Sequence, residues 1–183
     1  MLMAKDACEV RDMWFTLAQS HAEVAEAQYQ SGGYDFTIFH AYHAYECALC
    51  ALIASERWEV PPHGGTRSDG KDYYQGPLSI PVGKGEHDAR AKFAAKLLTP
   101  AKPYHDVYSR LDARRRWRNE SLYVEDGKLP RDRFTQKNAE WCLKNVKRFM
   151  QELWKDIQNK PPNAAPKSTP GTSTVSPPSA GSS

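Results

Sequence analysis

Apolar residues recur at intervals of three and four along most of the first 159 positions, the spacing that gathers side chains on one face of a helix. The pattern predicts a first helix over residues 6–30, ended by the glycines at 32 and 33. A second predicted helix, over residues 34–58, is apolar on nearly all sides, which is typical of the central helix of a bundle. Three more are predicted over residues 87–98, over residues 104–125, and from a cap at Thr135 up to Pro161. The pattern therefore predicts an all-α fold, an antiparallel bundle of about five helices.

Two segments depart from this pattern. Residues 59–86 are rich in glycine, proline and serine, and we expect a long insertion loop there, with residues 78–82 as a candidate short strand. Residues 160–183 contain no aromatic residue, so they bury too little apolar surface to offset the entropy of ordering them. We therefore predict one helical domain over residues 1–159 and a disordered tail, rich in proline, serine and threonine, over residues 160–183.

The charge and the cysteine content of the chain indicate its cellular compartment and the partners it can have. The chain has 25 basic and 22 acidic residues, a net charge of +3, so any basic surface must be local. Cys47 and Cys50 lie three apart in one predicted helix, which argues against a disulfide framework and favours a reducing compartment. Charged residues near the N-terminus do not fit a signal peptide, and the longest apolar stretch, residues 41–54, is too short to span a bilayer. We expect a cytoplasmic protein with no membrane partner.

The predicted helix over residues 104–125 carries arginines on its apolar face. At 100° per residue, a stripe roughly 80° wide holds Tyr104, Val107, Leu111, Arg115, Arg118 and Leu122. A guanidinium group in that setting must meet a carboxylate, a phosphate or a partner's polar groups, because unpaired burial costs several kcal/mol. One interpretation pairs the arginine with a residue such as Glu46 or Asp112 at the edge of the bundle. The other is an anion-binding cleft or a dimer seam built around Arg118.

The same helix is locally basic, with five arginines within residues 110–118. Arg114, Arg115 and Arg118 are our candidates for RNA or anion binding, since guanidinium groups suit phosphate contacts. A basic run can also be no more than a solvated face.

The second predicted helix carries histidines and cysteines in the pattern H-x2-H-x3-C-x2-C, formed by His40, His43, Cys47 and Cys50. These residue types suit zinc, but ten residues of helix rise about 15 Å, too far for one tetrahedral ion. We expect them to pack in or near the core, with no bound metal. His43 and Glu46, three residues apart, are expected to form a small polar network.

Sequence patterns of other catalytic classes are weak. There is no nucleophile elbow and no glycine-rich phosphate loop, and we expect no cofactor. His87 and His105 each open a helical segment and are followed by aspartate, which suits a neighbour of a helix cap better than a general base.

Three pieces of the chain resemble the HEPN superfamily, which comprises helical bundles of prokaryotic toxin, defence and RNA-processing systems. The segment GYDFTIFHAYHAYECAL, residues 33–49, is similar to the family's second helix, with small and aromatic residues around a Q-A-x-E-type core. A His-Asp pair opening a helix after a long loop is present as His87-Asp88 or as His105-Asp106. The segment RNESLY, residues 118–123, resembles the family's arginine, polar residue, three-residue spacer and histidine. The likeness spans roughly residues 10–155.

The resemblance implies a catalytic site, and this chain differs from the family at one residue of that site. Active members are metal-independent ribonucleases whose arginine and histidine, paired across a dimer seam, act on the RNA phosphodiester. Arg118 and Asn119 match that motif, whereas Tyr123 stands in the place of the histidine, or Leu122 in variants with the histidine one residue earlier. Neither an alkyl group nor a phenol, whose ordinary pKa is about 10, is the usual general acid or base near pH 7.

Three functions are compatible with these residues. The first is a catalytically degenerate RNA-binding or scaffold module that partners an active toxin or effector of the same system. The second is a metal-independent endoribonuclease that uses Arg118 with Tyr123 or with a displaced histidine such as His43 or His105. The third is a bundle that holds a nucleotide or an acidic protein segment in an arginine-lined groove. The family's usual homodimer would bring two copies of the 104–125 helix together.

Overall fold

The computed structural model describes residues 7–56, 86–124 and 127–159. These residues form an all-helical structure without strands, which confirms the predicted fold class. The helices, seven within the described ranges, are α1 (Ala7–Gln30), α2 (Tyr34–Glu56), α3 (Glu86–Leu97), α4 (His105–Asp112), α5 (Trp117–Glu120), α6 (Pro130–Arg133) and α7 (Gln136–Ile157). No helix among them is long and apolar enough to cross a membrane.

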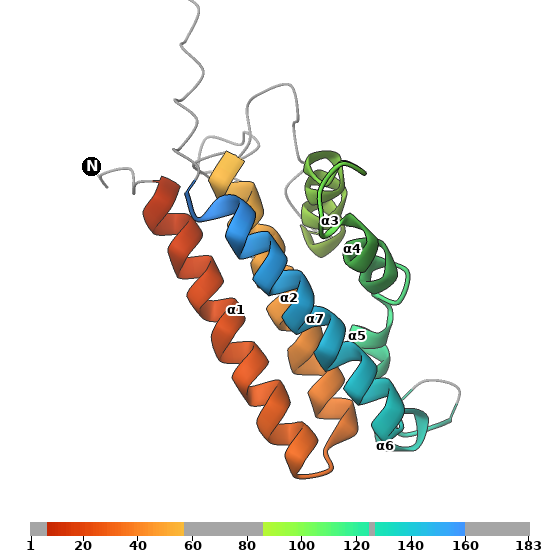
Figure 1. The fold of residues 1–183 in the computed structure, drawn as a ribbon. Coiled ribbons are helices and arrows are strands. Elements are labelled where there is room, and N and C mark those ends of the chain that lie inside the picture. The colour runs from red at the N-terminus through yellow and green to blue at the C-terminus, as the bar shows by residue number, and fades with distance from the viewer. Residues whose placement is uncertain (1–6, 57–85, 125–126, 160–183) are drawn as a thin grey trace, which may run out of the picture.

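Three long helices, α1, α2 and α7, run side by side and contain more than half of the described residues (Figure 1). The α1–α2 hairpin turns at Gly32, whose φ of +81° is a left-handed conformation that favours glycine. The amide of Gly33 donates to the carbonyl of Gln28 at 2.9 Å and closes the end of α1. The predicted first and second helices are thus confirmed over the described residues.

Helix α2 is the centre of the bundle, as its apolar pattern predicts. It packs against α1, α3, α5, α6 and α7, and its tyrosines at positions 42 and 45 are fully buried. The Tyr42 hydroxyl donates to the carbonyl of Leu111 at 3.1 Å, so the phenol also holds the end of α4 against α2. One face of α7 completes the core, with buried residues that include Cys142, Val146, Phe149, Met150, Leu153 and Ile157.

A capping box begins α7 where the sequence predicts a cap. Thr135 Oγ1 accepts from the amide of Asn138 at 3.4 Å, and the Thr135 amide donates to Asn138 Oδ1 at 3.0 Å. Two backbone donors that the helix itself leaves unpaired are satisfied in this way.

The prediction of one continuous helix over residues 104–125 is wrong. Helix α4 ends at Asp112, the next turns are closed by i, i+3 hydrogen bonds such as Trp117 N to Arg114 O at 2.9 Å, and α5 is a single short helix. The cause is tertiary packing of Trp117, whose ring lies edge-on to Phe134 and to Trp141, both at 5.7 Å between ring centroids. Burying this large ring outweighs the weak preference of the segment for a regular helix.

Because of this break, the residues of the predicted arginine stripe lie in three different environments. Tyr104, Val107 and Leu111 are buried, Arg115 and Arg118 are half-buried, and Leu122 is exposed. A further short helix, α6, lies between the helix predicted over residues 104–125 and the one predicted to begin at Thr135, where the sequence pattern predicts no helix.

Several predictions fall outside the described residues. These are the insertion loop up to residue 85, the candidate strand at residues 78–82, and the disordered tail at residues 160–183.

Candidate functional site

Arg118 lies on α5 and reaches across to α2. Its Nε is 3.3 Å from Oε2 of Glu46, and the two side chains are 19% and 16% exposed. Its Nη1 donates to Oδ1 of Asn119 at 3.3 Å. Of the pairings that the sequence allows, the structure selects the one with Glu46, and the ion pair fastens α5 to the central helix.

His43 lies one turn before Glu46 on α2. Its ring stacks on that of His21 from α1 at 5.2 Å between centroids, and meets Phe39 edge-on at 4.3 Å. Burial first and the positive charge of Arg118 second lower the pKa of His43 to about 4, while Glu46 acts in the opposite direction. The imidazole is therefore neutral near pH 7, and it lies within electrostatic reach of both members of the ion pair.

A histidine pair that the sequence pattern does not reveal lies beside this group. Nδ1 of His21 and Nδ1 of His40 are 3.2 Å apart, and burial lowers the pKa of both imidazoles. The partner comes from α1, so only the folded hairpin brings it to His40. Cys47 and Cys50 are buried in the core as expected, and no group of three or more potential metal ligands occurs within the described parts of the chain.

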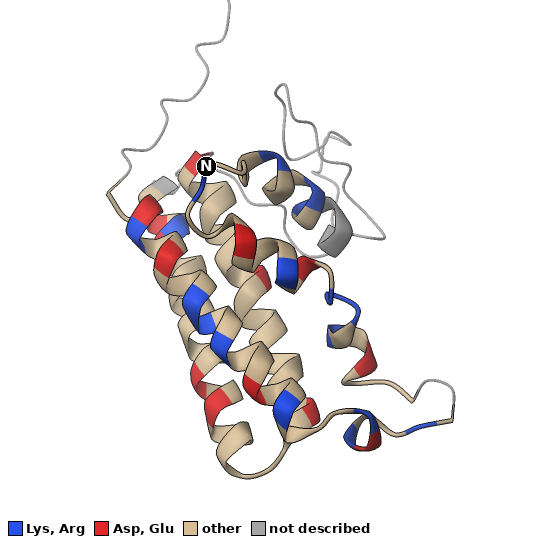
Figure 2. Ribbon diagram, turned by 45° about the vertical axis from the view of Figure 1, so that its right-hand side comes forward, with Lys and Arg blue, Asp and Glu red and all other residues tan. Residues whose placement is uncertain are grey.

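The other arginines of the basic segment contact groups of the same chain. The Arg114 guanidinium lies 4.4 Å from the ring centroid of Trp141 and 5.6 Å from that of Trp117. Acidic side chains pair with the rest, as Arg110–Asp106, Arg115–Asp112 and Arg116–Glu120. Figure 2 shows the result, basic and acidic residues interspersed along the helices rather than separated onto different faces.

Tyr123 follows α5 and closes a turn, with its amide donating to the carbonyl of Asn119 at 3.1 Å. Its side chain is 61% exposed, and its neighbours Leu122 and Val124 are 39% and 62% exposed. The structure therefore joins Arg118 and Asn119 through a hydrogen bond and leaves Tyr123 in solvent beside two exposed aliphatic side chains.

His105 is the first residue of α4, and its ring lies 6.1 Å from that of Tyr108. The adjacent Asp106 pairs with Arg110 rather than capping the helix.

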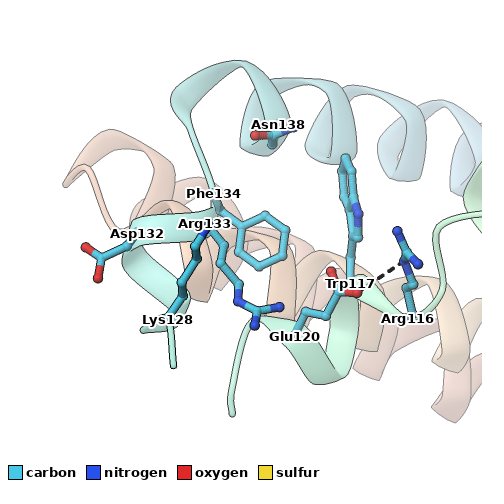
Figure 3. A pocket seen from close by; sticks show the side chains of 8 residues that line it. All are labelled: Arg116, Trp117, Glu120, Lys128, Asp132, Arg133, Phe134 and Asn138. Atoms are coloured by element: carbon cyan, nitrogen blue, oxygen red, sulfur yellow. Dashed lines mark ion pairs between the residues drawn. The ribbon is translucent and has the colours of Figure 1, made fainter. Parts of the chain in front are cut away.

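A cleft of about 590 Å³ opens beside α5 (Figure 3). Its lining residues come from α5, from α6 with its flanking residues, and from the first turn of α7: Arg116, Trp117, Glu120, Lys128, Asp132, Arg133, Phe134 and Asn138. The arginines that the sequence singles out, at positions 114, 115 and 118, do not line it. Sequence reasoning missed this cleft, although the basic and aromatic run KLPRDRF over residues 128–134 is a signal that could have led to it.

Comparison with known proteins identifies the α1–α2 hairpin. The family model of the HEPN domain matches residues 12–71. Over these residues the chain is similar to HEPN domains. This match confirms the resemblance carried by residues 33–49, and HEPN domains include ribonuclease and defence modules that commonly dimerise and bind RNA. No curated protein and no solved structure matches the chain.

The HEPN match ends at residue 71, before the arginine motif at residues 118–123, and the folded chain brings the two segments into contact. Glu46 and His43 belong to the matched segment, and both lie within electrostatic reach of Arg118. The arginine motif thus lies against the α1–α2 hairpin, although about 60 residues separate the end of α2 from Arg118 in the sequence.

Proposed function

We propose that this chain is an RNA-binding HEPN module that has lost the acid–base partner of its motif arginine. It would serve as an RNA-binding or scaffold component of a toxin, defence or RNA-processing system, partnering an active protein of that system. One observation carries the proposal: Arg118 is in place but tied to Glu46 at 3.3 Å, and the imidazole near it has a pKa of about 4.

The low pKa of His43 argues against efficient catalysis. General acid–base catalysis works best when the pKa of the group is near the working pH. With a pKa of about 4, only about one His43 imidazole in a thousand is protonated at pH 7, so it cannot donate a proton to a leaving group and accepts one poorly. Tyr123, at the motif's histidine position, offers no imidazole in its place.

RNA binding by this module would depend on local positive charge. The arginines at 110–118 and the basic side chains at Lys128, Arg131 and Arg133 follow one another along the chain around α5 and α6. Arg118 contributes by holding α5 on α2, which fixes the position of the neighbouring arginines. Such contacts release counterions from RNA, so the affinity should fall steeply as salt rises.

We also infer that the module dimerises through the segment that contains α4 and α5. Leu122, Tyr123 and Val124 form a run of exposed apolar side chains directly after the motif arginine. Contact between two such runs would remove apolar surface from water and place two copies of the arginine motif near each other.

An active metal-independent endoribonuclease is the second candidate. It is supported by the charge of Arg118, which contributes to lowering the pKa of His43 and so acts on an imidazole of the same chain. Arg118 would then stabilise the charge of the transition state and His43 would accept the proton of the ribose 2′-hydroxyl. The nucleotide-binding alternative is supported by a different feature, the cleft beside α5, which Arg118 does not line.

Binding and cleavage of a labelled single-stranded RNA in EDTA separate these functions. The wild type is compared with Arg118→Ala and Tyr123→Phe, and with Arg148→Ala as a matched control. Like Arg118, Arg148 on α7 is paired with a glutamate, in its case Glu152. Salt-sensitive binding without cleavage, weakened in Arg118→Ala alone, supports the proposal. Cleavage that disappears in Arg118→Ala establishes a ribonuclease instead. Unchanged RNA affinity in Arg118→Ala excludes the proposed role of this arginine.

A further inference from the structure

The aromatic residues that line the cleft beside α5 suit the binding of a nucleotide base. Trp117 is half-buried and lines the cleft, and Phe134 meets its ring edge-on at 5.7 Å and 67°. Trp141 also meets the Trp117 ring edge-on, at 5.7 Å and 72°, and the Arg114 guanidinium lies 5.6 Å from its centroid, so the indole is held in one orientation. A fixed, partly exposed aromatic ring is a platform on which an unpaired base can stack.

Cationic side chains lie at the mouth of the same cleft. Lys128 and Arg116 are exposed, and Arg133 extends past the Phe134 ring on the side of Lys128 (Figure 3). Two carboxylates, Glu120 and Asp132, also line the cleft, and Glu120 pairs with Arg116 at 3.1 Å. Three cations against two acids leave a small positive excess, which suits one phosphate, while a carboxylate can accept from a ribose hydroxyl.

Asn138 gives the cleft a directed hydrogen-bond donor. Its Oδ1 accepts from the Thr135 amide at 3.0 Å and from Thr135 Oγ1 at 2.7 Å. A backbone N–H can only donate, so the atom that faces Thr135 must be the amide oxygen and not the nitrogen. The capping box of α7 therefore turns the NH2 group of Asn138 away from Thr135, and Asn138 lines the cleft.

We propose that this cleft takes one unstacked nucleotide of a single-stranded RNA, with the base against Trp117, the phosphate near Lys128 and Arg133, and a base carbonyl accepting from Asn138. The inference rests on the proposed RNA-binding function and adds to it a subsite and a specificity. A volume of about 590 Å³ lies within the range of about 300–1,000 Å³ for small-ligand sites and is too small for a duplex. An asparagine amide recognises adenine through two bonds, by donating to N7 and accepting from N6, and the second is closed here because Oδ1 of Asn138 already accepts twice from Thr135. A uracil carbonyl needs only the NH2 donor, so uridine is favoured over adenosine.

The cleft and the arginine motif share one helix. Trp117 and Glu120 line the cleft, and Arg118 between them points to Glu46 on α2. A strand crossing α5 would thus place one base in the cleft while its neighbouring phosphates pass the arginine segment.

The test measures binding of ten-residue oligouridylate, ten-residue oligoadenylate and an RNA duplex by fluorescence anisotropy over a range of salt concentrations. Lys128→Gln removes an exposed charge at the mouth of the cleft and should weaken oligouridylate binding severalfold, with a salt slope smaller by about one. Asn138→Asp keeps an acceptor for the capping box but loses the NH2 donor, so it should abolish the preference for oligouridylate over oligoadenylate. Arg131→Gln is the matched control, because Arg131 is exposed on α6 and does not line the cleft.

The outcomes distinguish failure of the proposed subsite from failure of the proposed RNA-binding function. If the wild type binds RNA and both cleft variants behave like Arg131→Gln, the subsite is overturned while the proposed RNA-binding function stands. Duplex binding as tight as single-strand binding, or no preference between the two oligonucleotides in the wild type, also overturns the subsite. If the wild type binds none of the three RNAs, the proposed function and the subsite both fall.

Discussion

Arg118 on α5 and Glu46 on α2 form an ion pair of 3.3 Å between side chains that are more than four-fifths buried. The pair joins the α1–α2 hairpin to the helix that carries Arg118. Arg118 therefore has a structural role in this chain. A change at either residue tests stability and function at once, so the two effects must be measured separately.

Arg118→Ala should leave the protein folded but less stable. It removes the Arg118 cation from beside the largely buried Glu46 carboxylate, which costs more than the loss of an exposed pair. Allowing for partial exposure, we expect the free energy of unfolding to fall by about 1–2 kcal/mol, measured by urea denaturation followed by circular dichroism. Adding Glu46→Gln should recover part of the loss, since it removes a largely buried negative charge that the Arg118 cation no longer balances.

The control for this measurement is Arg148→Ala, whose pair with Glu152 has an arginine side chain that is 51% exposed. We expect it to change the free energy of unfolding by less than about 0.5 kcal/mol. Equal losses in the two variants would contradict a special structural role for the Arg118–Glu46 pair.

The stability of the protein should fall as the pH falls from about 6.5 to about 4. The pKa of His43 is lowered to about 4 in the folded protein, and its ordinary value in the unfolded chain is about 6.5. Between these values the unfolded chain binds more protons than the folded one, so acid favours unfolding. His21 and His40, whose pKa values are also lowered by burial, act in the same direction.

The measurement is the free energy of unfolding at several pH values in wild type and in His43→Gln. The variant should show a flatter dependence than the wild type between pH 6.5 and 4. Carboxylates titrate in both proteins, so only the difference between the two curves reports on His43. Parallel curves would show that His43 is not the group whose protonation is disfavoured.

The long helices were predictable from the sequence because their own spacing of apolar residues determines which face they bury. Residues 34–58 are apolar on nearly all sides, and the corresponding helix, α2, is the one that packs against most of the others. The cap at Thr135 was equally predictable, since it depends on residues only three positions apart.

The site was predictable only in part, because its contacts join segments that are distant in the sequence. The break after Asp112 comes from the packing of Trp117 on Phe134 and Trp141, which no local pattern encodes. The pairing of Arg118 with Glu46 was one of two alternatives until the fold selected it. The cleft beside α5 was not foreseen, because one side of it is formed by the α6 segment, for which the sequence pattern predicts no helix.

Tyr123→His should introduce metal-independent cleavage of single-stranded RNA, if the missing histidine is what silences the motif. Tyr123 is exposed, so the substitution should be tolerated, and an exposed imidazole has a pKa near 6.5, suitable for acid–base work near pH 7. The measurement is cleavage of labelled RNA in EDTA over pH 5–8, with Tyr123→Phe as the size-matched control. Combining Tyr123→His with Arg118→Ala should remove the gain. A silent Tyr123→His variant that still binds RNA would show that more than the histidine has been lost.

Val124→Asp should convert the inferred dimer into a monomer, since it places a charge in the exposed apolar run at residues 122–124. Burying an unpaired carboxylate against a second copy is unfavourable, whereas in the monomer the same side chain remains in water. The mass in solution, measured by light scattering after size-exclusion chromatography, reports the change directly. Met13→Asp is the matched control, because Met13 is an exposed apolar residue on α1, away from this segment. A wild type that is monomeric at every accessible concentration, or a Met13→Asp variant that dissociates while Val124→Asp does not, would exclude dimerisation through the α5 segment.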